Sequence, residues 1–367
     1  AEPATLHVAS PLRQSLPLTK EAGTAVYLKL DSSQPTGSFK IRGIGHLCQT
    51  VEPEPEPEPC LSRPSTGGNA GMAAAYSARQ LGVPATIVVP SVTPDLTVER
   101  LRDQGATVVV HGKALNDSIV HGQQLVENNP GWVFISPFDD PLIWEGHSSL
   151  VKELQQELRE KPGAIGLRRA AWGDVPVVAM ETRGAHSLNA RSVRAGELVT
   201  LPEITSVATT LGLARVSERT FALVQEHPVF SEVVTDQDAV AAVERFIGET
   251  RNPPPAPALS ARNPGDASPP PSADDEKILV EPACGAALAA VYSGVLRRLQ
   301  EEGKLAAPLG GPVVVVVCGG NNISVGQLQA EATAGPTWRG PPGGTCMNPA
   351  PPTGGWVPAL HKSLHSF

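Results

Sequence analysis

Short apolar runs alternate with longer amphipathic stretches along most of this chain of 367 residues. Apolar runs of strand length predict buried strands, whereas apolar residues recurring every three or four positions predict helices. The predicted strands are residues 25–30, 85–90, 106–110, 132–135, 175–180 and 313–317. The predicted helices are residues 41–49, 70–76, 94–104, 117–128, 147–160, 236–247 and 283–300. This alternation is typical of α/β folds built on parallel sheets.

Four stretches depart from the alternation. Residues 52–59 repeat Glu-Pro, and because proline removes a backbone donor while the glutamates repel one another, we expect an extended, solvated linker over residues 51–64. This linker stands where a buried strand would be expected. Residues 249–274 and the tail 331–367 are rich in proline and are expected to be disordered. Residues 1–24 are expected to form a polar, loop-rich lead-in.

The length and composition limit the classes of function. A chain of 367 residues is long enough for about two domains. The net charge of −8 argues against a nucleic-acid partner, which would favour a basic face. Apolar runs fall well short of the ~20 residues of a membrane span, and the start lacks the features of a signal peptide. The five cysteines are an odd number without metal-ligand spacing, which favours free thiols in a reducing cytoplasm.

The candidate chemistry begins with Lys40, in a stretch rich in small residues that runs from Gly37 to Gly43 just after a predicted strand. Glycines let the backbone approach a bound group, and the ring of Phe39 could cover a flat ligand. A desolvated lysine can lose its proton and attack a carbonyl to form a Schiff base. Taken alone, the stretch is also compatible with a surface turn.

Two further loops have the shape of ligand sites. Residues 66–69 (Thr-Gly-Gly-Asn) lead into a predicted helix, whose exposed N–H groups suit a carboxylate. Cys318, Gly319 and Gly320 follow the predicted strand 313–317, and parallel sheets bind ligands at the carboxyl ends of strands. An ordinary capped helix and a plain strand-to-helix turn are the alternatives for these two loops.

Together these motifs resemble the serine/threonine dehydratases, which are pyridoxal-phosphate enzymes of the tryptophan-synthase-β fold type, also called fold type II. The likeness covers about residues 5–50, 65–165, 172–248 and 274–330. The motifs that carry it are residues 36–46, 68–72, 84–90, 136–147, 280–288 and 317–320. The resemblance implies two open, twisted parallel-sheet domains: a large cofactor-binding domain of residues 1–43 and 146–330, and a small domain of residues 44–145.

The resemblance also implies roles at the cofactor. Lys40 would hold pyridoxal 5'-phosphate covalently, Phe39 would cover one ring face and Asn69 would hydrogen-bond the ring hydroxyl oxygen. Cys318, with Gly319 beside it, would face the pyridine nitrogen. A thiol is a weak partner for that nitrogen and tempers the electron sink, which suits β-elimination better than transamination.

The substrate and metal sites follow from the same resemblance. Thr66, Gly67, Gly68 and Asn69 would hold the carboxylate of a small amino-acid substrate. Glu181, with the carbonyls of Ala185 and Leu211, resembles a monovalent-cation site for K⁺; a partly buried ion pair is the alternative for Glu181. The family also implies a homodimer.

The chain departs from the family at the cofactor phosphate. Family members carry about four consecutive glycines after the strand that begins at residues 163–165, whereas here the sequence continues with residues 166–172 and no such run. We therefore expect that strand and the following helix to be missing. Arg168 and Arg169 fit a solvated charge pair better than a phosphate site.

These observations favour a dehydratase that converts L-serine, and L-threonine, to pyruvate or 2-oxobutanoate plus ammonia. A second interpretation is another enzyme of the same fold type, such as a serine racemase or a cysteine-synthase-like lyase. A third, of a different class, is an inactive or weakly active relative that acts as an interaction protein through the proline-rich residues 254–257.

Overall fold

The strands of the chain form two sheets, one of six strands in the order β1-β2-β10-β7-β8-β9 and one of four in the order β5-β4-β3-β6. The computed structural model describes residues 5–51, 61–64, 68–91, 93–113, 115–165, 172–188, 196–248, 278–320 and 322–333. Every strand pair is parallel except β1 with β2. The expected α/β class with parallel sheets is therefore confirmed.

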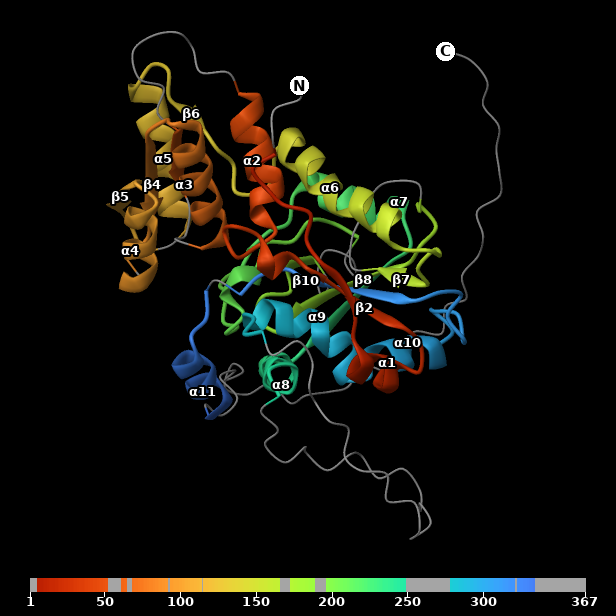
Figure 1. The fold of residues 1–367 in the computed structure, drawn as a ribbon. Helices are drawn as coiled ribbons and strands as arrows, with labels where there is room; N and C mark the ends of the chain where they lie inside the picture. The colour runs from red at the N-terminus through yellow and green to blue at the C-terminus, as the bar shows by residue number, and fades with distance from the viewer. Residues whose placement is uncertain are drawn as a thin grey trace. The chain divides into compact units, whose positions relative to one another are not determined.

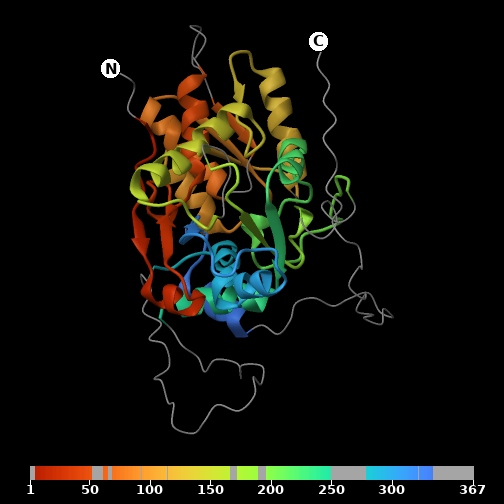
Figure 2. The same cartoon turned by 90° about the vertical axis from the view of Figure 1, so that its right-hand side faces the viewer.

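The six-stranded sheet runs from an edge near the N-terminus to an edge formed by β9, as Figure 2 shows from red to green. Its strands are β1 (Leu12–Gln14), β2 (Val26–Leu30), β10 (Val313–Val317), β7 (Ala164–Ile165), β8 (Val177–Thr182) and β9 (Val229–Val234). Strand β10 consists of five valines, all buried, and it pairs with β2 along its whole length. The carboxyl ends of β2 and β10 therefore lie side by side.

The valines of β10 divide between two hydrophobic clusters because side chains alternate across a strand. Val313, Val315 and Val317 pack with one face, and Val314 and Val316 pack with the other. One face carries α1 (Leu16–Ala22), α8 (Asp236–Phe246), α9 (Pro282–Tyr292) and α10 (Val295–Glu301), and the other carries α6 (Pro141–Glu157) and α7 (Glu218–Glu226) (Figure 1). The last described helix is α11 (Val325–Thr333).

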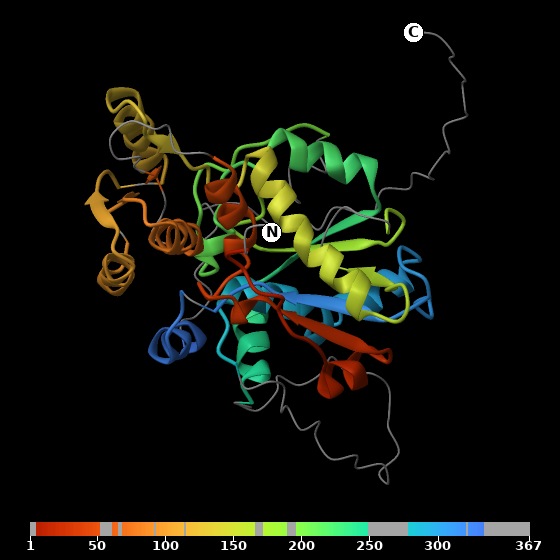
Figure 3. The same cartoon turned by 45° about the horizontal axis from the view of Figure 1, so that its top comes forward.

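The four-stranded sheet is also covered on both faces. It consists of β5 (Thr107–Val110), β4 (Ala85–Val89), β3 (Leu61–Pro64) and β6 (Val133–Phe134). Helices α3 (Asn69–Leu81) and α4 (Asp95–Asp103) lie on one face, and α5 (Leu115–Asn128) lies on the other (Figure 3). All five residues of β4 are buried, as expected for a central strand between two helical layers.

Helix α2 (Lys40–Thr50) crosses α6 at a point where two glycines meet. A Cβ added to Gly43 would lie 2.6 Å from the carbonyl oxygen of Ile143, and one added to Gly146 would lie 2.4 Å from that of Arg42. No side chain fits between the two backbones there, so the glycines fix how closely α2 can approach α6.

Arg42, two residues after Lys40, anchors the same crossing through a buried network of charges. Its guanidinium binds both carboxylate oxygens of Asp31 at 2.8 Å, just after β2. It also donates to both carboxylate oxygens of Glu153 on α6, at 2.6 and 2.9 Å. Glu153 in turn pairs with the buried ammonium of Lys29 at 2.8 Å. The network ties β2, α2 and α6 together.

Burial lowers the pKa of Arg42, but the hydrogen bonds that it donates to the carboxylates of Asp31 and Glu153 more than offset this and leave the pKa raised. For Glu153, burial raises the pKa, and the hydrogen bonds from Arg42 and Lys29 outweigh it, so that the pKa lies below its ordinary value. Both groups therefore stay charged at neutral pH.

The structure corrects the expected linker before the second loop. Residues 61–64 form β3, which pairs in parallel with β4 and β6, so the linker over 51–64 does not replace that strand. The Glu-Pro repeat ends at residue 59 and leaves four residues free to fill the gap between two neighbouring strands. Pro64 lies at the last position of β3, where a missing donor costs little.

The structure also corrects the strand that was expected to be missing near residue 165. Two residues of it remain as β7, between β10 and β8 in the large sheet. β7 ends at Ile165 and β8 begins at Val177, and this connection is shorter than the dozen or more residues of a usual helical crossover. Residues 166–171 of this connection lie outside the described residues, so the absence of the following helix stays a prediction.

The other differences concern the ends of elements. Residues 1–24 are not only loop, because they contain β1 and α1; the hydroxyl of Ser15 caps α1 by accepting from the N–H of Leu18. The predicted helix 283–300 is two helices, broken at Gly294 with φ of 68°. Helix α6 begins at Pro141, before the predicted start at residue 147, because Asp140 caps it.

Three further expectations concern membrane spans, the linker and disordered segments, and the domain boundaries. Within the part of the chain that is described, no helix is long and apolar enough to cross a membrane. The expected extended linker at residues 52–59 and the expected disorder of residues 249–274 and 334–367 concern positions outside the described residues. Residues 331–333 of the predicted tail, in contrast, belong to α11. The boundaries of the two predicted domains stay a prediction.

We predict that Arg42→Ala lowers the free energy of unfolding by about 3–5 kcal/mol, because it leaves the buried carboxylates of Asp31 and Glu153 without their partner. Urea denaturation measures this. The control is Arg219→Ala, which removes an exposed pair with Glu226 and should cost about 0–1 kcal/mol. Equal losses for the two variants would contradict the role of the Arg42 network.

We also predict a pH dependence from Glu153. Because its pKa is lower in the folded state, its stabilising contribution is complete above an unfolded-state pKa of about 4.3 and is lost as the pH falls through the folded-state value. The difference in unfolding free energy between the wild type and Glu153→Gln should therefore shrink between about pH 6 and about pH 3. A difference that stays constant over this range would argue against the assignment.

Candidate active site

The loop that carries Lys40 is joined to the loop that follows β10. The backbone N–H of Phe39 donates to the carbonyl of Cys318 at 2.9 Å, and the N–H of Gly320 donates to the carbonyl of Gly37 at 3.1 Å. Ser38 forms an isolated β-bridge with Gly319. Two of the three predicted loops are thus brought together, because β2 and β10 are neighbours.

Lys40 is the first residue of α2, and Phe39 is its N-cap. The Lys40 ammonium donates to the carbonyl of Pro137 at 2.8 Å and lies 5.2 Å from the centroid of the Phe39 ring. Gly37 has φ of 70°, a conformation that other residues rarely adopt, so the glycine allows the turn that delivers the lysine. The carbonyl of Pro137 holds the amine in place, and the motif alone did not reveal this contact.

His147 packs behind Phe39 with a distance of 5.1 Å between ring centroids and an interplanar angle of 41°. Burial, and then the nearby charges of Lys40 and Arg42, lower the pKa of His147 to about 3. The imidazole is therefore neutral at physiological pH. It supports the ring of Phe39 without adding a charge beside Lys40, a role that the sequence analysis did not assign.

Asn69 is the first residue of α3 and is buried, with an exposed fraction of 6%. Its side-chain amino group donates to Oε1 of Glu281 at 2.9 Å, and the hydroxyl of Thr210 donates to the same oxygen at 3.0 Å. The amide oxygen of Asn69 has no hydrogen-bond partner among the described residues. The third loop therefore joins the site through Glu281, which the sequence analysis quoted only as part of a motif.

Cys318 is the residue that follows β10, and its sulfur lies 2.9 Å from that of Cys284 on α9. The sulfur of Cys284 also lies 3.0 Å from the carbonyl oxygen and 3.0 Å from the backbone nitrogen of Gly319. Burial, and then Cys318 itself, raise the pKa of the Cys284 thiol. Cys284 therefore stays neutral and fixes Cys318 and Gly319 at the carboxyl end of β10.

Gly319 is the meeting point of the three segments. A Cβ at this position would lie 3.1 Å from Ser38, 3.3 Å from Oε1 of Glu281 and 3.4 Å from the side-chain nitrogen of Asn69. The absent side chain leaves room that those groups border. Gly319 was predicted as a cofactor-binding residue, and this role stays a prediction.

The remaining predicted residues are placed only in part. Gly68 precedes α3, and its carbonyl accepts from the N–H of Met72 at 3.1 Å, whereas Thr66 and Gly67 lie outside the described residues. Glu181 accepts from the N–H of Leu188 at 3.0 Å. The carbonyl of Leu211 accepts from the N–H of Leu213 at 2.7 Å, and Ala185 is buried. A monovalent-cation site at Glu181, Ala185 and Leu211 stays a prediction.

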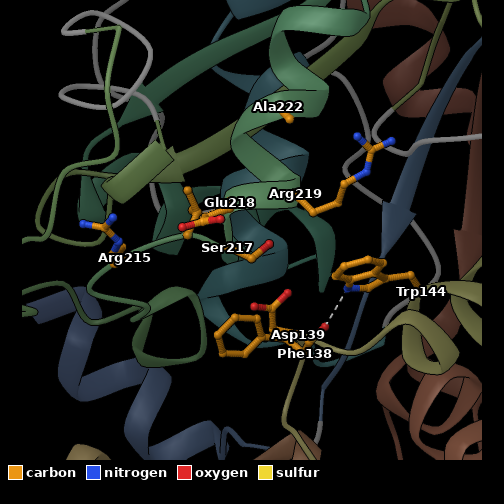
Figure 4. Close-up of a pocket in the computed structure, with 9 residues that line it drawn as sticks. Phe138, Asp139, Trp144, Arg215, Ser217, Glu218, Arg219 and Ala222 are labelled. Carbon is orange, nitrogen blue, oxygen red and sulfur yellow. Dashed lines mark hydrogen bonds between the residues drawn. The ribbon is translucent and has the colours of Figure 1, made fainter.

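A pocket of about 710 Å³ begins one residue beyond Pro137, the partner of Lys40 (Figure 4). The indole N–H of Trp144 donates to the carbonyl of Phe138 at 3.0 Å and holds one wall, and the N-terminus of α7 supplies the other. The lining residues are Phe138, Asp139, Trp144, Arg215, Val216, Ser217, Glu218, Arg219 and Ala222. Acidic and basic side chains both line this wide pocket, which contains none of the predicted cofactor-binding residues.

The residues at the Lys40 loop fit the ring of pyridoxal phosphate. An amine, a flat aromatic face, an amide and a thiol converge there, and the buried hydroxyl of Ser38, beside Phe39, lacks a hydrogen-bond partner among the described residues. Such buried polar atoms are uncommon unless a ligand or water binds them. The fit concerns the ring alone, because the segment expected to hold the phosphate, residues 166–171, lies outside the described residues.

Comparisons with known proteins agree with this geometry. The pattern of the family described as "Pyridoxal-phosphate dependent enzyme" matches residues 4–254. The chain is 55% identical to the L-serine dehydratase/L-threonine deaminase of Mus musculus, over 89% of this chain and 95% of that protein. It is 49% identical to the serine dehydratase-like protein of Rattus norvegicus, over 91% of this chain and 95% of that protein.

Solved structures of related enzymes are similar to this chain as well. The L-serine ammonia-lyase from the fungus Rhizomucor miehei has a TM-score of 0.75 and 34% identity, covering 89% of this chain and 98% of its own. Maize serine racemase, at 22% identity and a TM-score of 0.70, covers 88% of this chain and 91% of its own and shares the fold. With the amine of Lys40, the thiol of Cys318 and the amide of Asn69 gathered at one place, this chain belongs to the pyridoxal-phosphate dependent enzymes and has their type II fold.

Proposed function

We propose that this enzyme converts L-serine to pyruvate and ammonia, and L-threonine to 2-oxobutanoate and ammonia. Water is lost in the elimination, and a water is taken up again when the product of that step is hydrolysed and releases ammonia. The observation that carries the proposal is the joined pair of loops that sets Lys40 beside Cys318. The relatives named L-serine dehydratase/L-threonine deaminase support this substrate class, at 55% identity in both Mus musculus and Homo sapiens. The racemase interpretation has weaker support, because the racemase structure is only 22% identical.

When bound, pyridoxal phosphate supplies an electron sink connected to the α-carbon of the amino acid. Each residue near Lys40 then has a separate role. Lys40 would hold the cofactor through its side-chain amine, and the same amine, when free, would take the proton from the α-carbon of the substrate. Phe39, packed against His147, would cover one face of the ring. The amino group of Asn69 would donate to the ring hydroxyl oxygen.

Cys318 sets the balance between elimination and transamination. Its thiol shares a close contact with Cys284 and is a weak hydrogen-bond partner for a ring nitrogen. The ring therefore withdraws electrons less strongly than it would beside a carboxylate. β-Elimination tolerates this because the leaving hydroxyl carries the electron pair away. The backbone N–H groups at the start of α3, with Thr66, Gly67 and Gly68, would bind the substrate carboxylate.

Other parts of the proposal rest on the family resemblance. We expect K⁺ at Glu181, Ala185 and Leu211, a homodimer in solution, and action in the cytoplasm, where buried cysteines such as Cys48 and Cys284 stay reduced. The alternative of an interaction protein depends on residues 254–257, which lie outside the described residues.

We predict that Lys40→Ala abolishes both the visible absorbance of bound cofactor and the release of pyruvate from L-serine. The reason is that the amine held by the carbonyl of Pro137 is the one proposed to form the Schiff base with the cofactor. Spectrophotometry and a pyruvate assay at saturating cofactor measure the two effects. Lys304→Ala, which removes a lysine from the protein surface, is the control and should behave as the wild type. A Lys40→Ala variant that kept absorbance and turnover would disprove the assignment of Lys40.

We also predict weak binding of the cofactor, because residues 166–171 lack the glycine run that holds the phosphate in the family. Each charge-assisted hydrogen bond contributes about 1.5–3 kcal/mol, so that three or four of them amount to several orders of magnitude in Kd. Inserting four glycines within a family-like loop after Ile165 should strengthen binding and raise turnover. Cofactor titration and pyruvate release measure this for the two proteins.

The control for this experiment is the same insert with valine in place of each glycine, because β-branched residues do not adopt the turn that directs the N–H groups toward an anion. Only the glycine insert should improve binding. Tight binding and full turnover by the unmodified chain would contradict the prediction and would mean that another segment holds the phosphate.

A further inference from the structure

Glu281 is a buried acid at the start of α9. It is 2% exposed and is the N-cap residue of α9, but its side chain makes no capping bond to that helix. Its carboxyl group reaches instead to Asn69 at the start of α3 and to Thr210 on the short helix Thr209–Leu211. The side chain thus joins three segments that are distant in the sequence.

The two hydrogen bonds of Glu281 converge on one oxygen. Oε1 accepts from Asn69 at 2.9 Å and from Thr210 at 3.0 Å, and Asn322 also lies close to the carboxyl group. Burial raises the pKa of this carboxyl, and the interactions with Thr210, Asn69 and Asn322 lower it in part. If Glu281 takes up a proton, the proton belongs on Oε2, and Oε1 still accepts both bonds. The two bonds to Oε1 therefore do not require the charge.

This acceptor decides which way the amide of Asn69 is turned. Oε1 has no hydrogen to give, so it must face the amino group of Asn69 and not the amide oxygen. The amino group has a second hydrogen, and its nitrogen lies 3.4 Å from the position that a Cβ at Gly319 would occupy. The space left free by that glycine is therefore bordered by a donor whose orientation is fixed.

A fixed donor is what the ring hydroxyl oxygen of pyridoxal phosphate requires, since this oxygen is an acceptor when it is ionised. A flipped amide would present Oδ1 there and repel it. We infer that Glu281 is a positioning residue of this enzyme, which acts through Asn69 by holding its amino group toward the ring hydroxyl of the cofactor. The inference rests on the proposed placement of the ring between Phe39 and Asn69, and deepens it.

The test separates the effect of the position of the side-chain oxygen at residue 281 from the effect of its charge. Glu281→Gln keeps an oxygen where Oε1 lies, whereas Glu281→Asp keeps the charge and withdraws the oxygen by one methylene. We expect Glu281→Asp to weaken cofactor binding by about tenfold or more, because a buried polar group then loses one hydrogen bond. We expect the Kd of Glu281→Gln to stay within about threefold of the wild-type value. Titration of the apoprotein with pyridoxal phosphate gives the Kd, and the visible band of the complex should shift in the Asp variant alone.

A double-mutant cycle then tests whether Glu281 acts through Asn69. If it does, Asn69→Ala with Glu281→Ala should bind the cofactor no more weakly than Asn69→Ala by itself. Glu331→Ala and Glu331→Gln are matched controls, because Glu331 is another partly buried acid whose pKa is raised by burial and it lies outside this site. Both should leave the Kd and the visible band unchanged.

The opposite results would overturn the inference. One is a Glu281→Asp variant that binds the cofactor and absorbs as the wild type does, and another is a Glu281→Gln variant that loses as much affinity as Glu281→Asp. The third is a double alanine variant whose increase in Kd equals the product of the increases caused by the two single substitutions. If Glu281→Ala does not fold, Glu281→Asp replaces it in the cycle with Asn69→Ala. The two possible results, independent or coupled effects on the Kd, are then read in the same way. A wild-type protein without Lys40-dependent absorbance would refute the proposed function itself, whereas normal absorbance with unaffected position 281 variants would refute the inference alone.

Discussion

The reactive lysine stands on a helix whose position is fixed by a buried guanidinium. Arg42 follows Lys40 by two residues, so whatever holds Arg42 also holds the first turn of α2. Asp31, at the end of β2, and Glu153, on α6, hold it from two sides, at 2.8 and 2.6 Å. Buried ion pairs often add little net stability, because desolvating the charges costs about as much as their attraction returns. The main effect of this network is therefore to hold the first turn of α2, and with it Lys40, in place.

The site assembles because neighbouring parallel strands end at the same edge of a sheet. β2 delivers the loop of Lys40 and β10 delivers Cys318 and Gly319, and backbone hydrogen bonds join the two loops directly. Glu281 then links this edge to Asn69, on a helix that covers the other sheet. One part of the site is thus built from backbone contacts, and the other depends on a single carboxyl oxygen.

The sequence predicted the features that follow from local pattern. Five consecutive valines can form little other than a buried strand, and β10 is that strand. A lysine between glycines after an apolar run indicated the reactive loop. The sequence could not show that Glu281 meets Asn69, because this contact depends on how two helix starts face each other across 212 positions. It also concealed β3, since four residues after a proline repeat carry too little pattern to be read as a strand.

The two-residue length of β7 has a mechanical consequence for the large sheet. β7 pairs with β10 at two positions and with β8 at one, whereas β10 pairs with β2 at five and β8 with β9 at six. Among the described residues, pairing across the sheet is therefore sparsest at β7. Strands β8 and β9 pair with each other at many positions and with the rest of the sheet at few. Local opening begins where the fewest bonds must break. Backbone amides along β7 should thus exchange with solvent earlier than those of β10, and the sheet should part along this seam when it is pulled.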